Sequence, residues 1–467
     1  MSIAHIFAKL LNLFHRRRPR SQTSEDLVLG ISAEPNSSNP VIVLPAALRA
    51  QHLGIVGLSG NGKTYFIEHL VRQDIQHHTG FALFDVHGDL ADSIVAFLAE
   101  RLSFDRGVYE RAVILEPFDP QQSFGFNPVE RNARTSLFLQ AQEFAAMLRQ
   151  RWGEDLLSPR TEELLRNSLY TLAENDETLL RLPALLCDET TRKRLIKKLQ
   201  PGHVRNYWNA RYDQLSSRMQ SAYREPLLSR VSSFIADPQI RDIVGQQKST
   251  FSFHEAMRKG HWVIINLSKG RLGENSEILG SMLFTKLELD IMALAQVPED
   301  ERKLFAVYAD ELQNLSGDTF GRLIAEARKY RVSLVTGHQF WKQLDAPLRE
   351  ALLAVGSKAF FRLHFHDALE LAGELAATER KRYIRLLTTL ERGEVIVRIG
   401  NKRAVLISVP GHRAANPTQA DVGKLRAANA ERYTVARATL HDHFEPQEVN
   451  TTEKNNQTLA NSATKTL

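Results

Sequence analysis

Short apolar runs alternate with segments of helical periodicity in two parts of the chain, before about residue 130 and after about residue 260. Runs of four to six residues, rich in Val, Ile, Leu and Phe, are typical of buried strands. The predicted strands are 41–44, 53–56, 81–84, 112–115, 262–267, 304–309, 332–336, 359–363, 395–399 and 404–409. Predicted helices between them include 65–73, 276–295, 317–330 and 343–355. Such alternation predicts an α/β fold with a mostly parallel, doubly wound sheet.

The middle of the chain lacks this alternation. Between about residues 130 and 255, apolar side chains such as Leu137, Phe144 and Met147 recur at helical spacing, and strand patterns are absent. The sequence therefore predicts an all-helical insertion between two parts of an α/β core.

Both ends of the chain differ from the core. Residues 3–20 combine an apolar helical stripe with a basic run, which could dock on an anionic membrane surface or touch nucleic acid. The alternative is a terminal helix without a partner or a frayed tail. Residues 20–40 are polar and contain Ser, Asn and Pro, so we expect a linker or a poorly packed lead-in there. From about residue 440 the chain is polar, and disorder is predicted.

Composition narrows the class of protein. The 467 residues allow two or three domains, and 43% hydrophobic with 24% charged residues is ordinary for a globular protein. A single cysteine, Cys187, excludes an intramolecular disulfide and favours a reducing compartment, so a cytoplasmic location is expected. No apolar run reaches 18 residues, so no transmembrane helix is expected. The net charge of +6 is compatible with a polyanionic partner but identifies none.

Residues 57–64 form a complete phosphate-binding loop of the GxxxxGK[ST] type. The loop follows a predicted strand and precedes a predicted helix, which is the context that the motif requires. We expect Lys63 to reach the β- and γ-phosphates and the Thr64 hydroxyl to bind Mg²⁺. The expected nucleotide-binding residues are Gly57, Ser59, Gly60, Asn61, Gly62, Lys63, Thr64 and Tyr65.

Two carboxylates, Asp310 and Glu311, follow the predicted strand 304–309. In this position Asp310 is expected to bind Mg²⁺ together with Thr64, and Glu311 to polarise the attacking water. A glutamate of this kind distinguishes ATPases from kinases, which exclude water. The alternative is that the Asp-Glu pair only caps a helix.

Two further polar side chains follow strands whose ends should meet at the same edge of the sheet. Asp85 is a candidate for orienting water or the Mg²⁺ shell. Gln339 is a candidate sensor of the γ-phosphate or its attacking water, or else a turn residue bonded to backbone. His87 is expected to be a turn residue or hydrogen-bond partner, since no Cys/His cluster indicates a zinc site.

Cations stand at several helix and strand ends. Arg328, at the end of the predicted helix 317–330, could complete the site of a neighbouring subunit, and Arg362 is a competing candidate. Alternatively, Arg328 is a solvated cation at a helix C-terminus. The basic clusters 192–198 and 380–382 could contact DNA phosphates or form solvated helix faces.

In this order the motifs resemble those of the HerA/FtsK-like branch of P-loop ATPases. The resemblance is strongest to the motor domain of type IV secretion coupling proteins of the TraD/TraG-like conjugative DNA-transfer group. It spans about residues 50–400 and is carried by the stretches 52–57, 84–90, 126–129, 309–314, 326–330 and 338–339.

The resemblance implies a RecA-like P-loop NTPase core with a mostly parallel sheet and an inserted all-helical domain. It also implies ATP and Mg²⁺ as cofactors, a homo-hexamer, sequence-nonspecific DNA as the substrate, and Arg328 supplied in trans. The implied divisions are an amphipathic and basic segment (1–25), a first core part with the phosphate loop (26–130), the helical domain (131–255), a second core part (256–420), and a C-terminal helix with a disordered tail (421–467).

The N-terminal segment departs from the family patterns. Membrane-bound coupling proteins carry N-terminal transmembrane helices, and HerA proteins begin with a small β-barrel for which only about 30 residues are available here. We therefore expect residues 3–20 to act as a reduced anchor, peripheral at the inner face of the membrane or on a secretion apparatus. Two other functions stay open: a secretion or packaging ATPase that moves protein, and a nucleotide-gated scaffold with little turnover.

Overall fold

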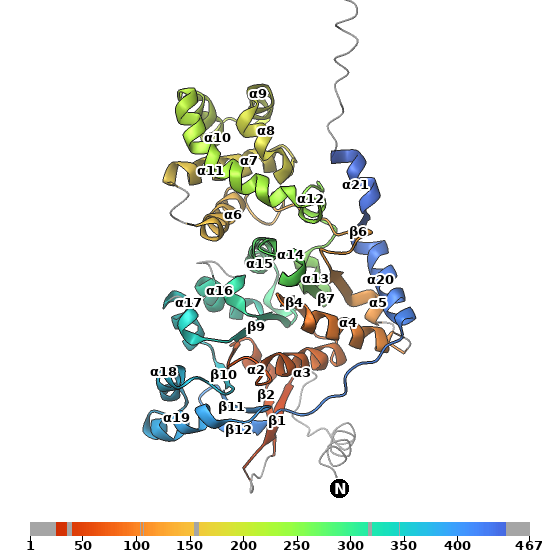
Figure 1. The fold of residues 1–467 in the computed structure, drawn as a ribbon, viewed down its shortest axis with the longest axis vertical. Helices are drawn as coiled ribbons and strands as arrows, with labels where there is room; N and C mark the ends of the chain where they lie inside the picture. The colour runs from red at the N-terminus through yellow and green to blue at the C-terminus, as the bar shows by residue number, and fades with distance from the viewer. Residues whose placement is uncertain are drawn as a thin grey trace, which may run out of the picture.

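The computed structural model describes residues 25–34, 40–102, 104–105, 107–153, 158–315, 320–344 and 346–444. Seven parallel strands form the body of the sheet: β3 (Leu53–Val56), β4 (Gly80–Asp85), β5 (Ala112–Leu115), β7 (Trp262–Asn266), β8 (Phe305–Asp310), β9 (Val332–His338) and β10 (Ser357–Phe360). Antiparallel strands extend one side: β1 (Leu27–Ser32), β2 (Val41–Leu44), β11 (Glu394–Ile399) and β12 (Val405–Ser408). The resulting order is β2-β1-β12-β11-β10-β3-β9-β8-β4-β7-β5 (Figure 1). The predicted mostly parallel sheet is confirmed.

Strand β1 lies in the stretch for which the polar composition predicts a linker, and that prediction is wrong for residues 27–32. Leu27 and Leu29 are fully buried, and the strand pairs with β2 and β12. Gly30 permits this pairing because a Cβ there would lie 2.6 Å from the carbonyl oxygen of Ser408. The burial that stabilises β1 thus depends on a strand near the other end of the chain, which no local pattern shows.

Helices cover both faces of the sheet. On one face lie α3 (Lys63–Gln76) and α4 (Asp89–Arg101). On the other lie α13 (Phe253–Lys259), α15 (Asn275–Ala293), α16 (Phe320–Ala327) and α17 (Ala346–Leu353). Because successive side chains of a strand point to opposite faces, Leu83 joins one apolar core and Phe84 the other.

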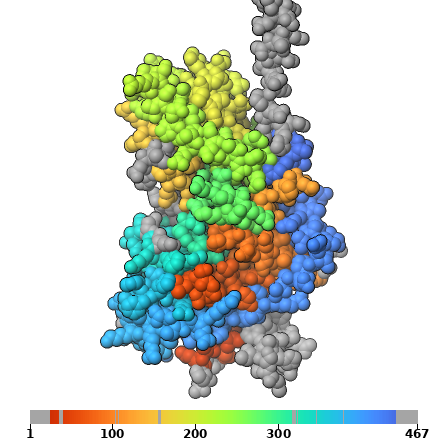
Figure 2. All heavy atoms as spheres, viewed as in Figure 1, coloured from red at the N-terminus to blue at the C-terminus, as the bar shows by residue number. Residues whose placement is uncertain are grey.

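The inserted domain occupies one end of the molecule (Figures 1 and 2). Its principal helices are α6 (Leu137–Trp152), α7 (Pro159–Glu174), α8 (Leu182–Cys187), α9 (Glu189–Lys198), α11 (Ser217–Ala236) and α12 (Pro238–Val244). The Ser136 and Ser158 hydroxyls cap the N-termini of α6 and α7. Inside the domain, the Trp208 indole donates to Thr171 at 2.9 Å. The predicted all-helical insertion is confirmed.

The C-terminal segment runs along the side of the core toward the helical domain (blue in Figure 2). It comprises α20 (Gln419–Tyr433), β13 (Val435–Ala436) and α21 (Arg437–Phe444). The amide of Asn429 pairs with the backbone N–H and carbonyl of Ile114, both at 2.8 Å, and so satisfies the open edge of β5. Arg437 forms a 2.5 Å ion pair with Asp242 of α12. This segment therefore ties the sheet edge to the helical domain.

Two predictions about the termini fall partly or wholly outside the described residues. Helix α21 reaches Phe444, past the point near residue 440 where the polar composition predicts disorder, and the remainder of the tail lies outside. The predicted amphipathic segment 3–20 also lies outside. None of the helices in the described ranges has the length and hydropathy of a membrane-spanning segment.

Candidate nucleotide site

The phosphate-binding loop joins β3 to α3 at the C-terminal edge of the parallel strands, where open α/β sheets bind ligands. Gly60 and Gly62 adopt left-handed conformations, with φ of 77° and 106°, which favour glycine. At the start of the loop, Gly57 donates its N–H to the carbonyl of His338 at 3.1 Å. The loop is therefore attached to the end of β9.

Within the loop, Asn61 and Lys63 bind the loop's own backbone. The Asn61 amide donates to the carbonyl of Ser59 at 3.1 Å. Lys63 Nζ donates to the carbonyls of Gly57 and Leu58 at 2.6 and 3.2 Å. Burial lowers the pKa of Lys63, although the nearby carboxylates of the Asp-Glu pair oppose the shift. These bonds keep the ammonium group inside the curve of the loop.

Thr64 and Asp310 meet across the site. The Thr64 hydroxyl donates to Asp310 Oδ2 at 2.9 Å, and Asp310 is only 3% exposed at the end of β8. Burial, with the charge of Glu311 next to it, raises the pKa of Asp310 to about 6. The other oxygen, Oδ1, is buried without a hydrogen-bond partner.

This pair of oxygens fits Mg²⁺. The unpartnered Oδ1 of Asp310 and the hydroxyl of Thr64, an exposed residue, are hard ligands on adjacent elements. No group of three or more His, Cys, Asp or Glu side chains that could hold a metal occurs in the described ranges. Mg²⁺ is usually bound by one or two protein oxygens with water and substrate phosphates, so such a closed cluster is not required.

Glu311 has an unusual backbone and a tightly bound side chain. Its φ is 59°, in the left-handed region that non-glycine residues rarely adopt. Its carboxylate accepts a 2.5 Å hydrogen bond from the amide nitrogen of Gln313. The amide oxygen of Gln313 lies 3.1 Å from Nδ1 of His338. Because an amide oxygen only accepts, Nδ1 of His338 carries the hydrogen. Burial lowers the pKa of His338 to about 3, so the ring is neutral.

Sequence reasoning assigned no role to Gln313 or to the side chain of His338. Their positions in the sequence do place both residues near the site, since Gln313 follows Glu311 by two residues and His338 ends the next parallel strand. The left-handed turn at Glu311, which lets Gln313 fold back, is not visible in the sequence.

The carboxylate of Asp85 is bound by backbone N–H groups. Its two carboxylate oxygens accept the N–H groups of His87 and Ala91, each at 2.9 Å. It therefore shapes the turn between β4 and α4 and positions that turn beside the site. Gln339 is half-buried just after β9 and makes no side-chain hydrogen bond within the described part of the chain.

The two candidate arginines lie at opposite edges of the sheet. Arg328 is exposed in a 3₁₀ turn, Arg328–Tyr330, just before the start of β9. Arg362 is also exposed, and its carbonyl accepts the N–H of Leu58 in the phosphate loop at 2.9 Å. Within one chain, Arg362 therefore lies beside the loop, whereas Arg328 is at the far end of the strands.

Tyr65, in the first turn of α3, faces away from the carboxylates toward the segment that follows β12. Its ring stacks on His412, with centroids 3.9 Å apart, and its hydroxyl bonds to the backbone of His412. His412 Nε2 lies 3.2 Å from Glu68 of the same helix. The residue after the phosphate loop is thus bound to the strap that leads to α20.

Comparisons with known proteins identify a family and a shared fold. Residues 37–350 match the family described as the type IV secretion-system coupling protein DNA-binding domain. No curated protein matches the chain.

Several solved structures share the fold. The unbound bacterial conjugative coupling protein TrwBdeltaN70 has a TM-score of 0.60 and 17% identity, with 88% of this chain and 93% of that chain covered. The plasmid coupling protein TrwB bound to a non-hydrolysable ATP analogue has a TM-score of 0.61 and 16% identity over 88% and 94%. VirB4 of Thermoanaerobacter pseudethanolicus has a TM-score of 0.52 and 14% identity over 83% and 96%. The predicted RecA-like P-loop fold is confirmed.

Proposed function

The chain belongs to the family of type IV secretion-system coupling protein DNA-binding domains, and from that membership we propose that it is an oligomeric ATPase that moves DNA. The observation that carries the catalytic part is the Thr64–Asp310 hydrogen bond, with Glu311 immediately after it. TrwB, which shares the fold, has been solved with a non-hydrolysable ATP analogue and with ADP and Mg²⁺. We therefore propose ATP and Mg²⁺ as the ligands of this site.

Each group near the loop has a role in hydrolysis. Lys63 and the backbone N–H groups of the loop would bind the phosphates. Thr64 and Asp310 would hold Mg²⁺, which neutralises charge on the phosphates when it is bound. Glu311 would accept a proton from the attacking water. Asp85 would keep the β4–α4 turn in place.

Gln339 is the remaining polar group at this edge. It follows β9 next to His338, whose carbonyl holds the phosphate loop, and its amide has no hydrogen-bond partner among the described residues. We propose that it senses the γ-phosphate or the attacking water. A free amide beside the loop supports this role over that of a turn residue bonded to backbone.

A ring of several copies would bring Arg328 of one chain to the phosphate loop of another. Arg328 lies at the opposite edge of the sheet from its own phosphate loop, so it can approach a phosphate only in another copy of the chain. We propose that Arg328 stabilises the transition state in trans in a hexamer. Arg362, beside its own loop, is the alternative and would act in cis.

The DNA contact is proposed for the helical domain, which lies inside the matched range 37–350. Part of the basic cluster on α9 is already used: Arg192 is buried against Asp213, and Lys193 pairs with Glu189. The other three cations of this cluster, Arg194, Lys197 and Lys198, are exposed and have no hydrogen-bond or ion-pair partner among the described residues. They can contact phosphates without reading bases.

The second basic cluster supports DNA binding less well. Arg380 donates to the carbonyl of Leu369, and Arg382 pairs with Glu379. These residues also lie outside the matched range. We therefore assign the DNA contact to α9.

For residues 3–20 we propose a peripheral contact with the inner face of the membrane or with a secretion apparatus.

One experiment separates the candidate functions. ATPase rates of the full chain are measured without DNA, with single-stranded DNA and with double-stranded DNA, while particle mass is recorded with nucleotide present. Stimulation by either DNA and a mass near six chains support the proposal. Turnover that no DNA stimulates would instead favour a protein-moving ATPase, and absence of turnover would favour a nucleotide-gated scaffold.

A further inference from the structure

The turn that follows Glu311 is bound to three parts of the molecule through one residue, Gln313. Its amide nitrogen donates to the Glu311 carboxylate at 2.5 Å, and its amide oxygen accepts from His338 Nδ1 at 3.1 Å. Its backbone carbonyl accepts from the guanidinium of Arg151 at 3.4 Å. Arg151 belongs to the last turn of α6, in the inserted helical domain. The helical domain therefore touches the residue that holds the proposed catalytic base.

We propose that Gln313 is a positioning residue that restrains Glu311 until the helical domain engages DNA. This inference rests on the proposed ATPase function and adds its regulation. A carboxylate that accepts a short hydrogen bond from an amide has fewer lone pairs free to orient water. Release of that bond would return Glu311 to the attacking water.

Strain in the backbone supports a restrained state. Glu311 is held at φ 59°, a strained conformation that a non-glycine residue keeps only where its surroundings enforce it. Contacts of the backbone on either side hold Glu311 in this conformation. Glu311 N–H donates to the carbonyl of Gly337, and the 3₁₀ turn Leu312–Asn314 places Gln313 directly against the carboxylate.

His338 connects the same restraint to the nucleotide. While its ring donates to Gln313, its backbone carbonyl accepts the N–H of Gly57 at the start of the phosphate loop. Its other ring nitrogen, Nε2, is buried and has no hydrogen-bond partner. The Gln313–His338 pair therefore joins the turn after Glu311 to the phosphate loop, so a displacement of either one should displace the other.

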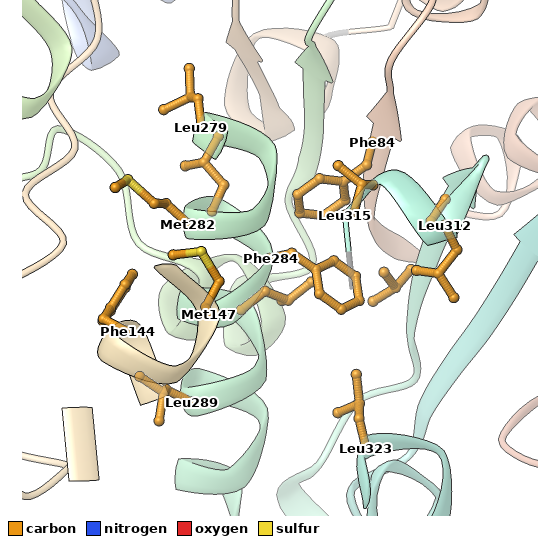
Figure 3. Close-up of a cluster of buried hydrophobic side chains, with 14 of the residues drawn as sticks. Phe84, Phe144, Met147, Leu279, Met282, Phe284, Leu289, Leu312, Leu315 and Leu323 are labelled. Carbon is orange, nitrogen blue, oxygen red and sulfur yellow. The ribbon is translucent and has the colours of Figure 1, made fainter. Parts of the chain in front are cut away.

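Apolar packing provides the mechanical connection to the helical domain. Figure 3 shows Phe284 of α15 between Met147 of α6 and the two leucines that flank Gln313, Leu312 and Leu315. Close-packed interiors transmit displacement rather than absorb it. A shift of α6 when DNA binds the domain would move both the leucines and the Arg151 contact, and with them Gln313.

The test uses steady-state hydrolysis by the full chain, with and without DNA, for wild type and Gln313→Ala. We expect Gln313→Ala to raise the DNA-free kcat at least three-fold with unchanged KM for ATP, and to lower the DNA-stimulation ratio toward one. Arg151→Ala should shift both quantities in the same direction, by less. Asn314→Ala, which removes a neighbouring amide from the same turn, should behave as wild type. Melting temperatures identify any variant that does not fold, and Gln313→Met, which keeps the length but cannot donate, then replaces it.

The outcomes separate the inference from the function on which it rests. A Gln313→Ala protein whose DNA-free kcat is unchanged or lower, with stimulation intact, would overturn the restraint. A wild-type protein that hydrolyses no ATP under either condition would instead overturn the proposed function.

Discussion

Thr64 and Asp310 are 246 positions apart in the sequence, yet the Thr64 hydroxyl donates to the Asp310 carboxylate at 2.9 Å. The parallel register of the sheet brings the end of β8 to the phosphate loop. The contact joins the residue that follows the loop lysine to the first carboxylate of the Asp-Glu pair. It also leaves one buried oxygen of Asp310 free for a cation.

The Mg²⁺ contribution to nucleotide binding should depend on pH through Asp310. Its pKa, raised to about 6 by burial and by Glu311, means that the carboxyl is protonated in the nucleotide-free protein below about pH 6. Protonated Asp310 cannot bind Mg²⁺. The ratio of ADP affinities with and without Mg²⁺ should therefore fall several-fold as the pH drops from about 7.5 to about 5.5. In Asp310→Asn the ratio should be small and independent of pH; an equal pH dependence in both proteins would contradict the assignment.

Removal of one partner of a buried ion pair at the other edge of the sheet should destabilise the fold strongly. Arg49 and Asp74 are both 0% exposed and form two bonds of 2.8 and 2.7 Å, with the Tyr308 hydroxyl donating to Asp74 at 2.6 Å. Asp74→Ala would leave the guanidinium buried and unpaired, so we expect a loss of about 3–5 kcal/mol in urea unfolding.

Two variants provide the controls for this loss. Tyr308→Phe removes one hydrogen bond and should cost about 1–2 kcal/mol. Arg131→Ala breaks an ion pair whose side chains are 48% and 59% exposed and should cost under about 1 kcal/mol. Equal effects of Asp74→Ala and Arg131→Ala would show that an unpaired guanidinium at position 49 carries no special cost.

Acid should destabilise the fold partly through His52. Burial lowers the pKa of His52 to about 4, and its two ring nitrogens bond to the carbonyl of Ile324 and the N–H of Leu334. The unfolded chain binds the proton near the ordinary pKa of about 6.5. Stability is therefore lost as the pH falls from about 6.5 toward 4, by about 2 kcal/mol at pH 5. His52→Asn, which suits the left-handed backbone there, should show a pH dependence of unfolding about 2 kcal/mol smaller. An unchanged pH dependence would contradict this role.

Local patterns in the sequence predict those parts of this protein whose structure is determined by residues close together in the chain. The phosphate loop, the apolar strands and the helical insertion can each be recognised from residues that are neighbours in the sequence. Strand 27–32 cannot be recognised in this way, because its burial depends on β12 at the other end of the chain.

The same limit applies within the site. The sequence shows that Asp310 and Glu311 follow a strand, but not that Gln313 folds back onto Glu311 through a left-handed turn. It also does not show that Asp85 is occupied by backbone N–H groups or that Arg192 is buried inside a basic run. These roles depend on side-chain contacts that form only after the elements have packed.

DNA affinity should depend on α9. Replacing Arg194, Lys197 and Lys198 with alanine should weaken binding to all DNA sequences equally. It should also reduce the slope of log affinity against log salt by about 2–3, since each phosphate contact contributes about 0.7–0.9. Fluorescence anisotropy over a salt series measures both quantities. The matched control is the triple alanine variant of Arg380, Lys381 and Arg382, which should bind as wild type. If the control lost affinity and the α9 variant did not, the DNA contact would lie on the core instead.

The proposed role of Glu311 is to activate water in an ATPase that DNA stimulates. The most direct test measures phosphate release by wild type and Glu311→Gln, with and without DNA, alongside binding of a fluorescent ATP analogue. Glutamine keeps the shape of the side chain but cannot accept the proton. We predict DNA-stimulated release by wild type, and at least a hundred-fold loss in Glu311→Gln with nucleotide binding retained. Phosphate release by Glu311→Gln at the wild-type rate, or release by wild type that no DNA changes, would contradict the account.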